Sequence, residues 1–175
     1  MKKYIAFLRG VNISGKNKIA MSELKQNFEE AGFSDVSTYL NSGNVKFSTD
    51  VDNSKAIIEA RIKEDFGLEI PVYVIENGLL NDILENAPSW WNSGDKSKYD
   101  NLIFIISNDS PEDICKLVGA PTENLEQIQN YKNVIFWTFD RNKYQKCNWW
   151  KKTATKEVAD RLTIRTANTI ERICK

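Results

Sequence analysis

The chain of 175 residues contains no histidine. Histidine is the usual general base near neutral pH, the partner of nucleophilic serine or cysteine, and a common metal ligand. Its absence excludes a Ser-His or Cys-His catalytic centre, so any catalysis would depend on carboxylates, lysine or a cofactor. No other residue pattern points to a metal or a cofactor, and we predict neither.

Cysteine is scarce as well, and the three residues Cys115, Cys147 and Cys174 form no CxxC pair. An odd number of widely spaced cysteines argues against a disulfide framework and is typical of a reducing compartment. Long apolar runs are also missing. The opening segment MKKYIAFLRG has five apolar residues in a row, fewer than a signal peptide or a membrane span needs. We therefore expect a cytoplasmic protein without a membrane segment.

Charge is balanced overall but unevenly distributed, with 24 basic and 24 acidic residues. Residues 1–27 carry six basic residues against one acidic, a net charge of +5, and residues 141–175 carry ten against three, a net charge of +7. The segment between them has a net charge of −12. Basic ends around an acidic middle predict a local face that attracts anions, unless the segments mix on the surface.

The order of expected elements in the first half is strand, helix, two strands, helix, strand. Apolar periodicity and turn residues place them at 4–9, 22–32, 35–40, 44–48, 54–67 and 71–76. Gly32 and Gly67 stand where helices end, and Ser42-Gly43 is a hairpin turn signal. This βαββαβ order is typical of a ferredoxin-like lobe.

The second half repeats the order less clearly. We expect a helix at 78–86, a polar linker or functional loop, a strand at 101–107, a helix starting at Ser110-Pro111, a strand at 133–139, a weaker strand at 144–149, a helix from Thr155, a strand at 163–166 and a terminal helix starting at Asn168. The sequence therefore predicts an α+β fold of two ferredoxin-like βαββαβ lobes with mixed or antiparallel sheets, packed as one compact protein. The lobes are 1–86 and 101–175, with the linker at 87–100.

Residues 9–18, RGVNISGKNK, follow the first strand and resemble a phosphate-binding loop. The run from Gly10 matches G-x-x-x-x-G-K-[ST] except at the last position, where Asn17 replaces the hydroxyl that holds magnesium. Such a loop places its Gly-Lys at a helix start, but Ile19, Ala20 and Met21 come before the expected helix. We therefore do not expect an NTPase.

Topology makes a stronger argument for an anion site. In a βαββαβ sheet, the ends of the first two strands and the start of the third share one edge. That edge gathers cations, amides, a hydroxyl and glycine N–H groups, which suit a phosphate or carboxylate. Its candidate ligand-binding residues are Arg9, Asn12, Lys16, Asn17, Lys18, Asn41, Ser42 and Asn44. The alternative is that these are ordinary turn residues and solvated lysines.

Two other features have structural alternatives. The segment NWWKKTATK (148–156) interleaves aromatic residues with lysines, as nucleic-acid surfaces do, but Trp149 and Trp150 could instead anchor a helix to the sheet. The third strand of an RNA-recognition motif should be rich in aromatic residues, and SGNVKFST offers only Phe47. Sequence-specific RNA reading by that route is therefore not expected.

Residues 4–49 include the first expected strand, the loop after it, the first helix and the hairpin. This stretch resembles the bacterial family catalogued as Domain of Unknown Function 1697. The matching motifs are Leu-Arg-Gly-Val-Asn at 8–12, Gly-Lys-Asn at 15–17, Met21, Thr-Tyr at 38–39 and Ser-Gly-Asn-Val at 42–45. Many relatives carry Thr-x-Arg-Asn-Trp near the C-terminus, of which only Thr163 and Arg165 match here. The resemblance implies a two-lobed α+β fold and no assigned activity.

From these observations we predict a binding protein. Its ligand is an anion, either a nucleotide or a nucleic-acid phosphate, held at the N-terminal loop edge. Arg165 is a candidate contributor from the second lobe. The alternatives are an enzyme acting on a phosphorylated small molecule and a protein–protein interaction module.

Overall fold

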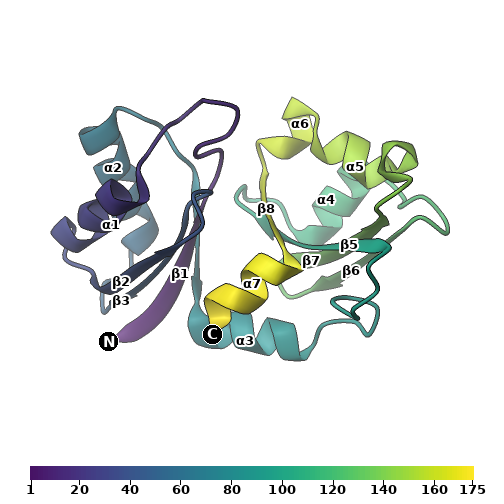
Figure 1. The fold of residues 1–175 in the computed structure, drawn as a ribbon, viewed down its shortest axis with the longest axis horizontal. Coiled ribbons are helices and arrows are strands. Elements are labelled where there is room, and N and C mark those ends of the chain that lie inside the picture. Colours follow the sequence, from purple (N-terminus) through teal and green to yellow (C-terminus); the bar gives the residue numbers. More distant parts are fainter. The chain divides into compact units, whose positions relative to one another are not determined.

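The computed structural model describes residues 1–175, which divide into two compact units, Met1–Asn81 and Asp82–Lys175 (Figure 1). Each unit contains one four-stranded sheet in which every neighbouring pair of strands is antiparallel. The division falls within helix α3 (Asn77–Glu85), whereas the sequence analysis assigned this helix wholly to the first lobe.

Unit 1 has the predicted element order. Its elements are β1 (Lys2–Leu8), α1 (Met21–Glu30), β2 (Ser34–Tyr39), β3 (Asn44–Thr49), α2 (Ser54–Phe66) and β4 (Val72–Glu76). The strand order is β2-β3-β1-β4, so β3 lies between β2 and β1, with Ala6 opposite Val45. The expected positions of all six elements agree with the structure, because apolar periodicity marks most of them and the hairpin signal at Ser42-Gly43 marks β2 and β3.

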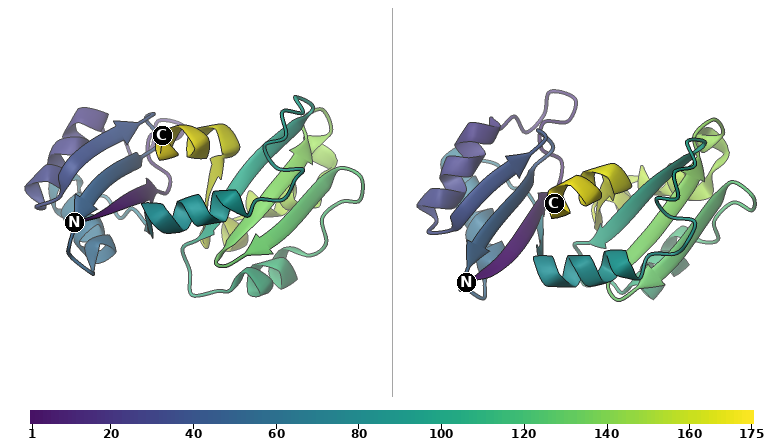
Figure 2. Two further views of the ribbon diagram at one scale, coloured as in Figure 1. Left: turned by 90° about the horizontal axis from the view of Figure 1, so that it is seen from below. Right: turned by 60° about the horizontal axis from the view of Figure 1, so that its bottom comes forward.

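The core of unit 1 lies between its sheet and the two helices α1 and α2, which cover the same face of the sheet (Figure 2). Leu24 and Phe28 of α1 are fully buried, as are Ile58 and Ile62 of α2. Phe28 meets Phe47 of β3 edge-on, with ring centroids 5.5 Å apart. This packing fixes the end of β1, from which the candidate loop departs.

Unit 2 repeats the topology with strand order β6-β7-β5-β8. Its elements after α3 are β5 (Lys98–Ile105), α4 (Pro111–Val118), β6 (Glu126–Tyr131), β7 (Val134–Asp140), the 3₁₀ turn η1 (Tyr144–Lys146), α5 (Asn148–Thr153), α6 (Lys156–Ala159), β8 (Leu162–Thr166) and α7 (Ala167–Cys174). Ser110 caps α4 as predicted, in a reciprocal capping box with Asp113. The predicted class of two ferredoxin-like α+β lobes is confirmed.

Two expectations for unit 2 were wrong. Residues 144–149 form η1 and the start of α5 rather than a strand, and the missing strand is β6. The sequence EQIQNY of β6 contains a single aliphatic residue, Ile128, because an edge strand needs few apolar side chains. The terminal helix begins earlier than expected, because Thr166 rather than Asn168 accepts the hydrogen bond from the backbone of Thr169.

Both faces of the unit 2 sheet are covered. On one face, Ile103, Ile135 and Trp137 pack with Ile114 of α4 and Trp149 of α5. On the other face, the Trp91 ring meets Phe136 at a centroid distance of 5.2 Å, and α7 packs on β5 and β8 (Figure 2). An exposed aromatic platform of the RNA-recognition type is therefore absent from this sheet. No helix in the chain has the length and apolar character of a membrane span.

Candidate functional site

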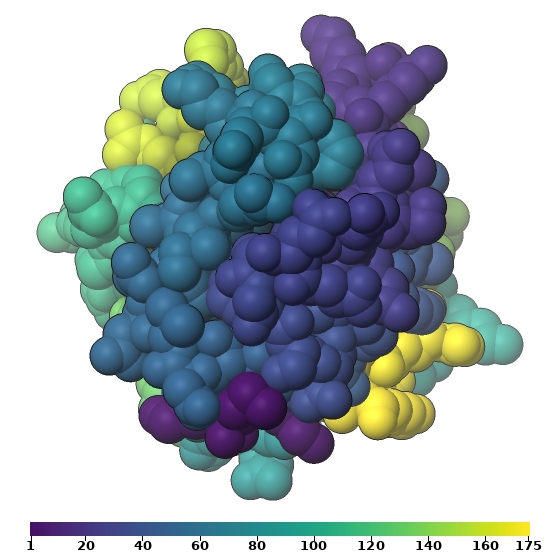
Figure 3. All heavy atoms as spheres, turned by 90° about the vertical axis from the view of Figure 1, so that its left-hand side faces the viewer, coloured from purple at the N-terminus to yellow at the C-terminus, as the bar shows by residue number.

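The candidate site in unit 1 is the edge formed by the loop 9–20, between β1 and α1, and the turn 40–43, between β2 and β3. We call these two segments the loop edge. The turn is tied to the end of β1, where Leu8 N–H donates to Gly43 O at 2.8 Å, and to the loop, where the side chain of Asn12 donates from Nδ2 to Asn41 O at 2.7 Å. Figure 3 shows the longer loop, in purple, projecting from the surface of the unit. The topology thus brings the two segments together in space.

Asn12 holds the loop in shape. Its Nδ2 donates to Ile19 O at 2.8 Å as well as to Asn41 O, and its Oδ1 accepts from Ile19 N–H at 2.9 Å. Its own N–H donates to Asn17 O at 3.1 Å, and its φ of 55° lies in the left-handed region that asparagine tolerates. Ile19 is buried, so this one amide closes the loop over the core.

Two other asparagines of the predicted site also bind backbone groups. Asn17 Nδ2 donates to Gly10 O at 3.0 Å, and the fully buried Asn44 donates to Tyr39 O at 2.9 Å and to Ser42 Oγ at 3.0 Å. The sequence analysis expected these amides to orient a ligand. In the structure, these donors are engaged with the loops themselves and fix the loop edge.

Gly43 is required where the turn passes β1. Its φ is +86°, and a Cβ added there would lie 2.7 Å from Leu8 Cβ. Any side chain would therefore push the turn away from the strand and open the edge. Leu40 in the same turn also has a positive φ, 57°, although it is not a glycine.

The charged side chains of the loop edge face the solvent. Lys16 and Lys18 are exposed, and their amines form no ion pair or hydrogen bond. Arg9 is half-buried at the end of β1, where its N–H donates to Pro71 O at 3.0 Å. Ile13 is 57% exposed and Leu40 is 53% exposed, so apolar surface lies on the same two segments as the lysines.

The loop is not a phosphate-cradling loop of the NTPase type. Helix α1 begins at Met21, so Gly15 and Lys16 lie within the loop instead of at a helix N-terminus. Lys16 N–H donates to Ile13 O at 2.9 Å, which closes a tight turn at the tip. The sheet beside it is antiparallel throughout.

Arg165 belongs to unit 2, in the middle of β8. Its Nη1 donates to Thr163 Oγ1 at 2.9 Å and to Ile164 O at 3.1 Å, and burial lowers the pKa of its guanidinium to about 10. A cation held in an environment that disfavours its charge is typical of functional positions. Its contribution to the loop-edge site stays a prediction.

The two tryptophans of the segment 148–156 pack against other parts of unit 2. Trp149 is fully buried, and its Nε1 donates to Gly119 O at 2.9 Å. Trp150 packs edge-on against Tyr144 at a centroid distance of 4.8 Å. Trp149 therefore anchors α5 to the core, which confirms the structural alternative for that residue.

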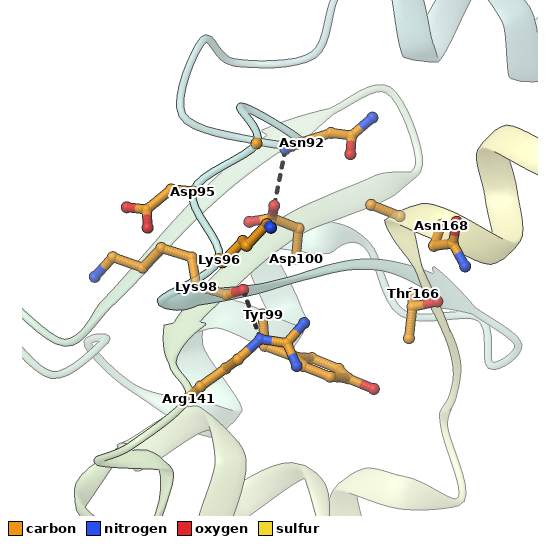
Figure 4. Close-up of a pocket in the computed structure, with 11 residues that line it drawn as sticks. Asn92, Asp95, Lys96, Lys98, Tyr99, Asp100, Arg141, Thr166 and Asn168 are labelled. Carbon is orange, nitrogen blue, oxygen red and sulfur yellow. Dashed lines mark hydrogen bonds between the residues drawn. The ribbon is translucent and has the colours of Figure 1, made fainter.

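Unit 2 contains a polar cavity of about 450 Å³ that the sequence analysis did not identify (Figure 4). It is lined by Asn92, Gly94, Asp95, Lys96, Lys98, Tyr99, Asp100, Arg141, Thr166, Ala167 and Asn168. The lining comes from the loop before β5, the start of β5, the residue after β7 and the junction of β8 with α7. Pairing of Lys98 with Asp140 and of Asn101 with Thr166 brings these distant segments together. The only signal in the sequence was the polar stretch before β5.

The structure has two further cavities. The first is less polar than the cavity lined by Arg141, and the second has a smaller volume. One of about 550 Å³ lies in unit 1 between α2 and residues 69–71, which precede β4, around Ala56, Ala60 and Ile70. Another of about 210 Å³ in unit 2 shares Asp95 and Lys98 with the polar cavity. No group of three or more acidic or cysteine side chains lies close enough together to hold a metal ion.

Two ferredoxin-like units in one chain, the first with a long closed loop after its first strand, define a two-lobed α+β protein. The chain belongs to the family described as Protein of unknown function (DUF1697), which matches residues 1–136. The resemblance inferred from the sequence is thereby confirmed at the level of the family.

Among solved structures, the conserved bacterial protein SP0830 from Streptococcus pneumoniae is similar over 99% of this chain and 97% of its own, with a TM-score of 0.81 and 26% identity. The first two RRM domains of yeast poly(U) binding protein (Pub1) match at a TM-score of 0.27 and 11% identity, over 95% of this chain and 99% of theirs, and that likeness carries no argument. No curated protein matches the chain.

Proposed function

We propose that the protein binds an anionic, phosphate-bearing ligand at the loop edge, either a nucleotide or a nucleic-acid strand. The observation that carries this proposal is the pair Lys16 and Lys18, two exposed cations without an ion pair on a loop that Asn12 holds in shape. A loop that is already ordered loses little conformational entropy when a ligand binds.

In this proposal, some residues of the loop edge supply positive charge and others contact the ligand through polar groups. Lys16 and Lys18, with Arg9 beside them, supply positive charge, which attracts phosphate over a distance of about one Debye length, roughly 10 Å at 0.1 M salt. Asn41, whose side chain is exposed, and Ser42 would contact the ligand.

The apolar side chains on the same segments favour a nucleotide or nucleic acid over inorganic phosphate. Ile13 and Leu40 expose more than half of their surface. Apolar area next to a few convergent polar groups is the usual composition of a small-molecule site. A base or sugar attached to the phosphate would cover this surface.

A second candidate function is an enzyme that acts on a phosphorylated small molecule. The polar cavity of unit 2 favours it, because ionisable side chains line a space large enough for such a substrate. A third candidate, an interaction module, is favoured by the exposed Ile13 and Leu40 alone. These candidates differ in which ligand binds and where.

The experiment that tests the proposal is a thermal-shift panel with nucleotides, sugar phosphates, short RNA and short DNA. We expect a ligand at 100 times its dissociation constant to raise the melting temperature of the wild type by about 5–10 °C. The double variant Lys16→Ala/Lys18→Ala should lose this shift while keeping the melting temperature of the unliganded protein. Lys55→Ala is the matched control, because it removes an exposed lysine of α2 that has no ion pair.

Salt dependence separates the two ligand classes. A nucleic-acid strand that displaces counterions loses affinity steeply as salt rises, whereas a mononucleotide loses less. Equal shifts in the wild type and in the double variant would contradict the loop-edge site. No shift with any phosphate compound would turn attention to a protein partner.

A further inference from the structure

We propose that the polar cavity of unit 2 is a separate binding site for a small phosphomonoester, with Arg141 as the residue that receives the phosphate. This site is independent of the loop edge, because all of its lining residues belong to unit 2.

Arg141 is held in a defined position before any ligand binds. Its Nε donates to Lys98 O at 3.1 Å, and its guanidinium carbon lies 4.7 Å from the centre of the Tyr99 ring (Figure 4). The Tyr99 ring is itself stacked on Phe139, with centroids 5.2 Å apart. Stacking and one hydrogen bond thus fix the plane of the guanidinium. Its two terminal nitrogens form no hydrogen bond or ion pair and present the planar fork that suits phosphate oxygens.

The cavity is lined by three cations, Lys96, Lys98 and Arg141, and by two carboxylates, Asp95 and Asp100. Asp95 accepts from Ser97 N–H at 2.9 Å and from Ser97 Oγ at 2.6 Å. Asp100 Oδ2 accepts from Asn92 N–H at 3.0 Å, whereas its buried Oδ1 has no hydrogen-bond partner. The amines of Lys96 and Lys98, like the end of Arg141, form no ion pair. The side chains that line the cavity therefore carry one more positive than negative charge, which favours an anion.

The remaining walls favour an ester over a bare ion. Thr166 and Asn168 stand opposite Arg141, on the side of α7, and the loop around Asn92 closes above them (Figure 4). A volume of about 450 Å³ is much larger than a phosphate group and lies in the range of sites for small metabolites. Hydroxyl and amide groups on these walls suit the hydroxyls of a sugar. A sugar phosphate and a nucleoside monophosphate share this chemistry.

The test is a titration of uniformly ¹⁵N-labelled full-length protein followed by its amide chemical shifts. The probes are adenosine monophosphate, a hexose phosphate and inorganic phosphate, with adenosine as the phosphate-free control. We expect saturable shifts at residues 92–100, 141 and 166–168, and none at 9–18. Binding of the nucleotide alone, or of the hexose phosphate alone, identifies the source of the phosphomonoester.

Variants assign the binding to Arg141. Arg141→Gln should weaken binding by about tenfold or more, because it removes charge-assisted hydrogen bonds. Arg141→Lys should recover only part of that loss, since lysine keeps the charge but not the fork. Lys143→Gln is the matched control, because it removes a positive charge from the same turn without touching the cavity. The spectrum of each free variant reports whether it is folded.

Three results would overturn the proposal. They are the absence of saturable binding by any phosphomonoester, equal affinities of Arg141→Gln and Lys143→Gln, and binding of inorganic phosphate as tight as that of the esters. Shifts confined to 9–18 would be a fourth result that overturns this site, and they would support the loop edge. Lys16→Ala should leave binding in the cavity unchanged, so the two proposals can fail separately.

Discussion

Leu40 adopts a backbone conformation that leucine rarely takes. Its φ is 57°, and its side chain is 53% exposed, so burial does not compensate for the conformation. A left-handed residue other than glycine or asparagine costs about 1–2 kcal/mol. Strain of this kind clusters at functional sites, and Leu40 lies in the loop edge.

We therefore expect Leu40→Gly to raise the free energy of unfolding by about 1 kcal/mol, because glycine relieves the steric strain. Leu40→Ala is the matched control, since it removes the same apolar surface but keeps a Cβ at positive φ. Urea denaturation followed by tryptophan fluorescence measures both. A gain in Leu40→Ala as large as in Leu40→Gly would assign the effect to the exposed side chain and contradict the strain argument.

Asparagine shows what a residue type can and cannot reveal. The sequence placed Asn12, Asn17 and Asn44 correctly at the loop edge, but it could not show where each amide points. Their hydrogen bonds depend on the path of a loop with several left-handed residues, which has no period to detect. The structure shows that the lysines beside them, Lys16 and Lys18, are exposed, and their role in binding an anion stays a prediction.

At the scale of elements, Glu126 joins strand β6 to the start of helix α5. The side chain is only 5% exposed, and its oxygens accept from the N–H groups of Trp149 at 3.1 Å and 3.2 Å, of Trp150 at 3.3 Å and of Thr122 at 2.9 Å. A carboxylate that meets several N–H groups at a helix start satisfies donors that have no partner within the helix.

Replacing this carboxylate should destabilise unit 2. We expect Glu126→Ala to lower the free energy of unfolding by about 2–3 kcal/mol, because it leaves buried N–H groups without acceptors. Gln127→Ala, an exposed neighbour on the same strand, should change it by less than about 0.5 kcal/mol. Urea denaturation compares the two. A Glu126→Ala protein as stable as Gln127→Ala would show that the capping contacts are not stabilising.

The contact between α3 and the turn after β6 responds to acid. Asp82 accepts from Lys132 Nζ at 2.5 Å and from Tyr131 OH at 3.1 Å. The hydrogen bond from Lys132, followed by that from Tyr131, holds the pKa of the Asp82 carboxyl below its ordinary value. A lowered carboxyl pKa adds stability that is complete above the unfolded pKa, about 3.9, and is lost as the pH falls through the folded pKa.

As the pH falls below about 4, the wild type should therefore lose stability more steeply than Asp82→Asn, which cannot titrate. The urea midpoint measured at intervals of pH gives both slopes. Parallel slopes would mean that the Asp82 contact contributes nothing in solution. Because the pair is exposed, we expect a modest difference.

Predictability also differed between elements. Unit 1 could be derived from its sequence because each strand and helix has an apolar stripe and a terminal glycine, proline or turn. In unit 2, β6 was not predicted because its residues are mostly polar. Residues 144–149 were predicted as a strand because Cys147 and Trp149 alternate with polar residues. Both cysteine and tryptophan are in fact buried beside a helix start that a distant glutamate caps, a contact that no local pattern reveals.

At the scale of the whole molecule, the charge distribution along the sequence was only a partial guide. It drew attention to Lys16 and Lys18 in the basic first segment. Lys96 and Lys98 lie in the segment with a net charge of −12, so the net charge of that segment gave no sign of them. Strand pairing places them near Arg141 from another segment, so this cavity could be found only from the three-dimensional structure.

The position of β8 and α7 at the end of the chain has a consequence for biosynthesis. β8 is an edge strand of the second sheet, and α7 covers that sheet on the face opposite α4. Unit 1 has all of its strands once residue 76 has been made and can fold while translation continues. Unit 2 lacks its edge strand β8 until residue 166 has been made, and until then the edge of β5 is exposed to other nascent chains.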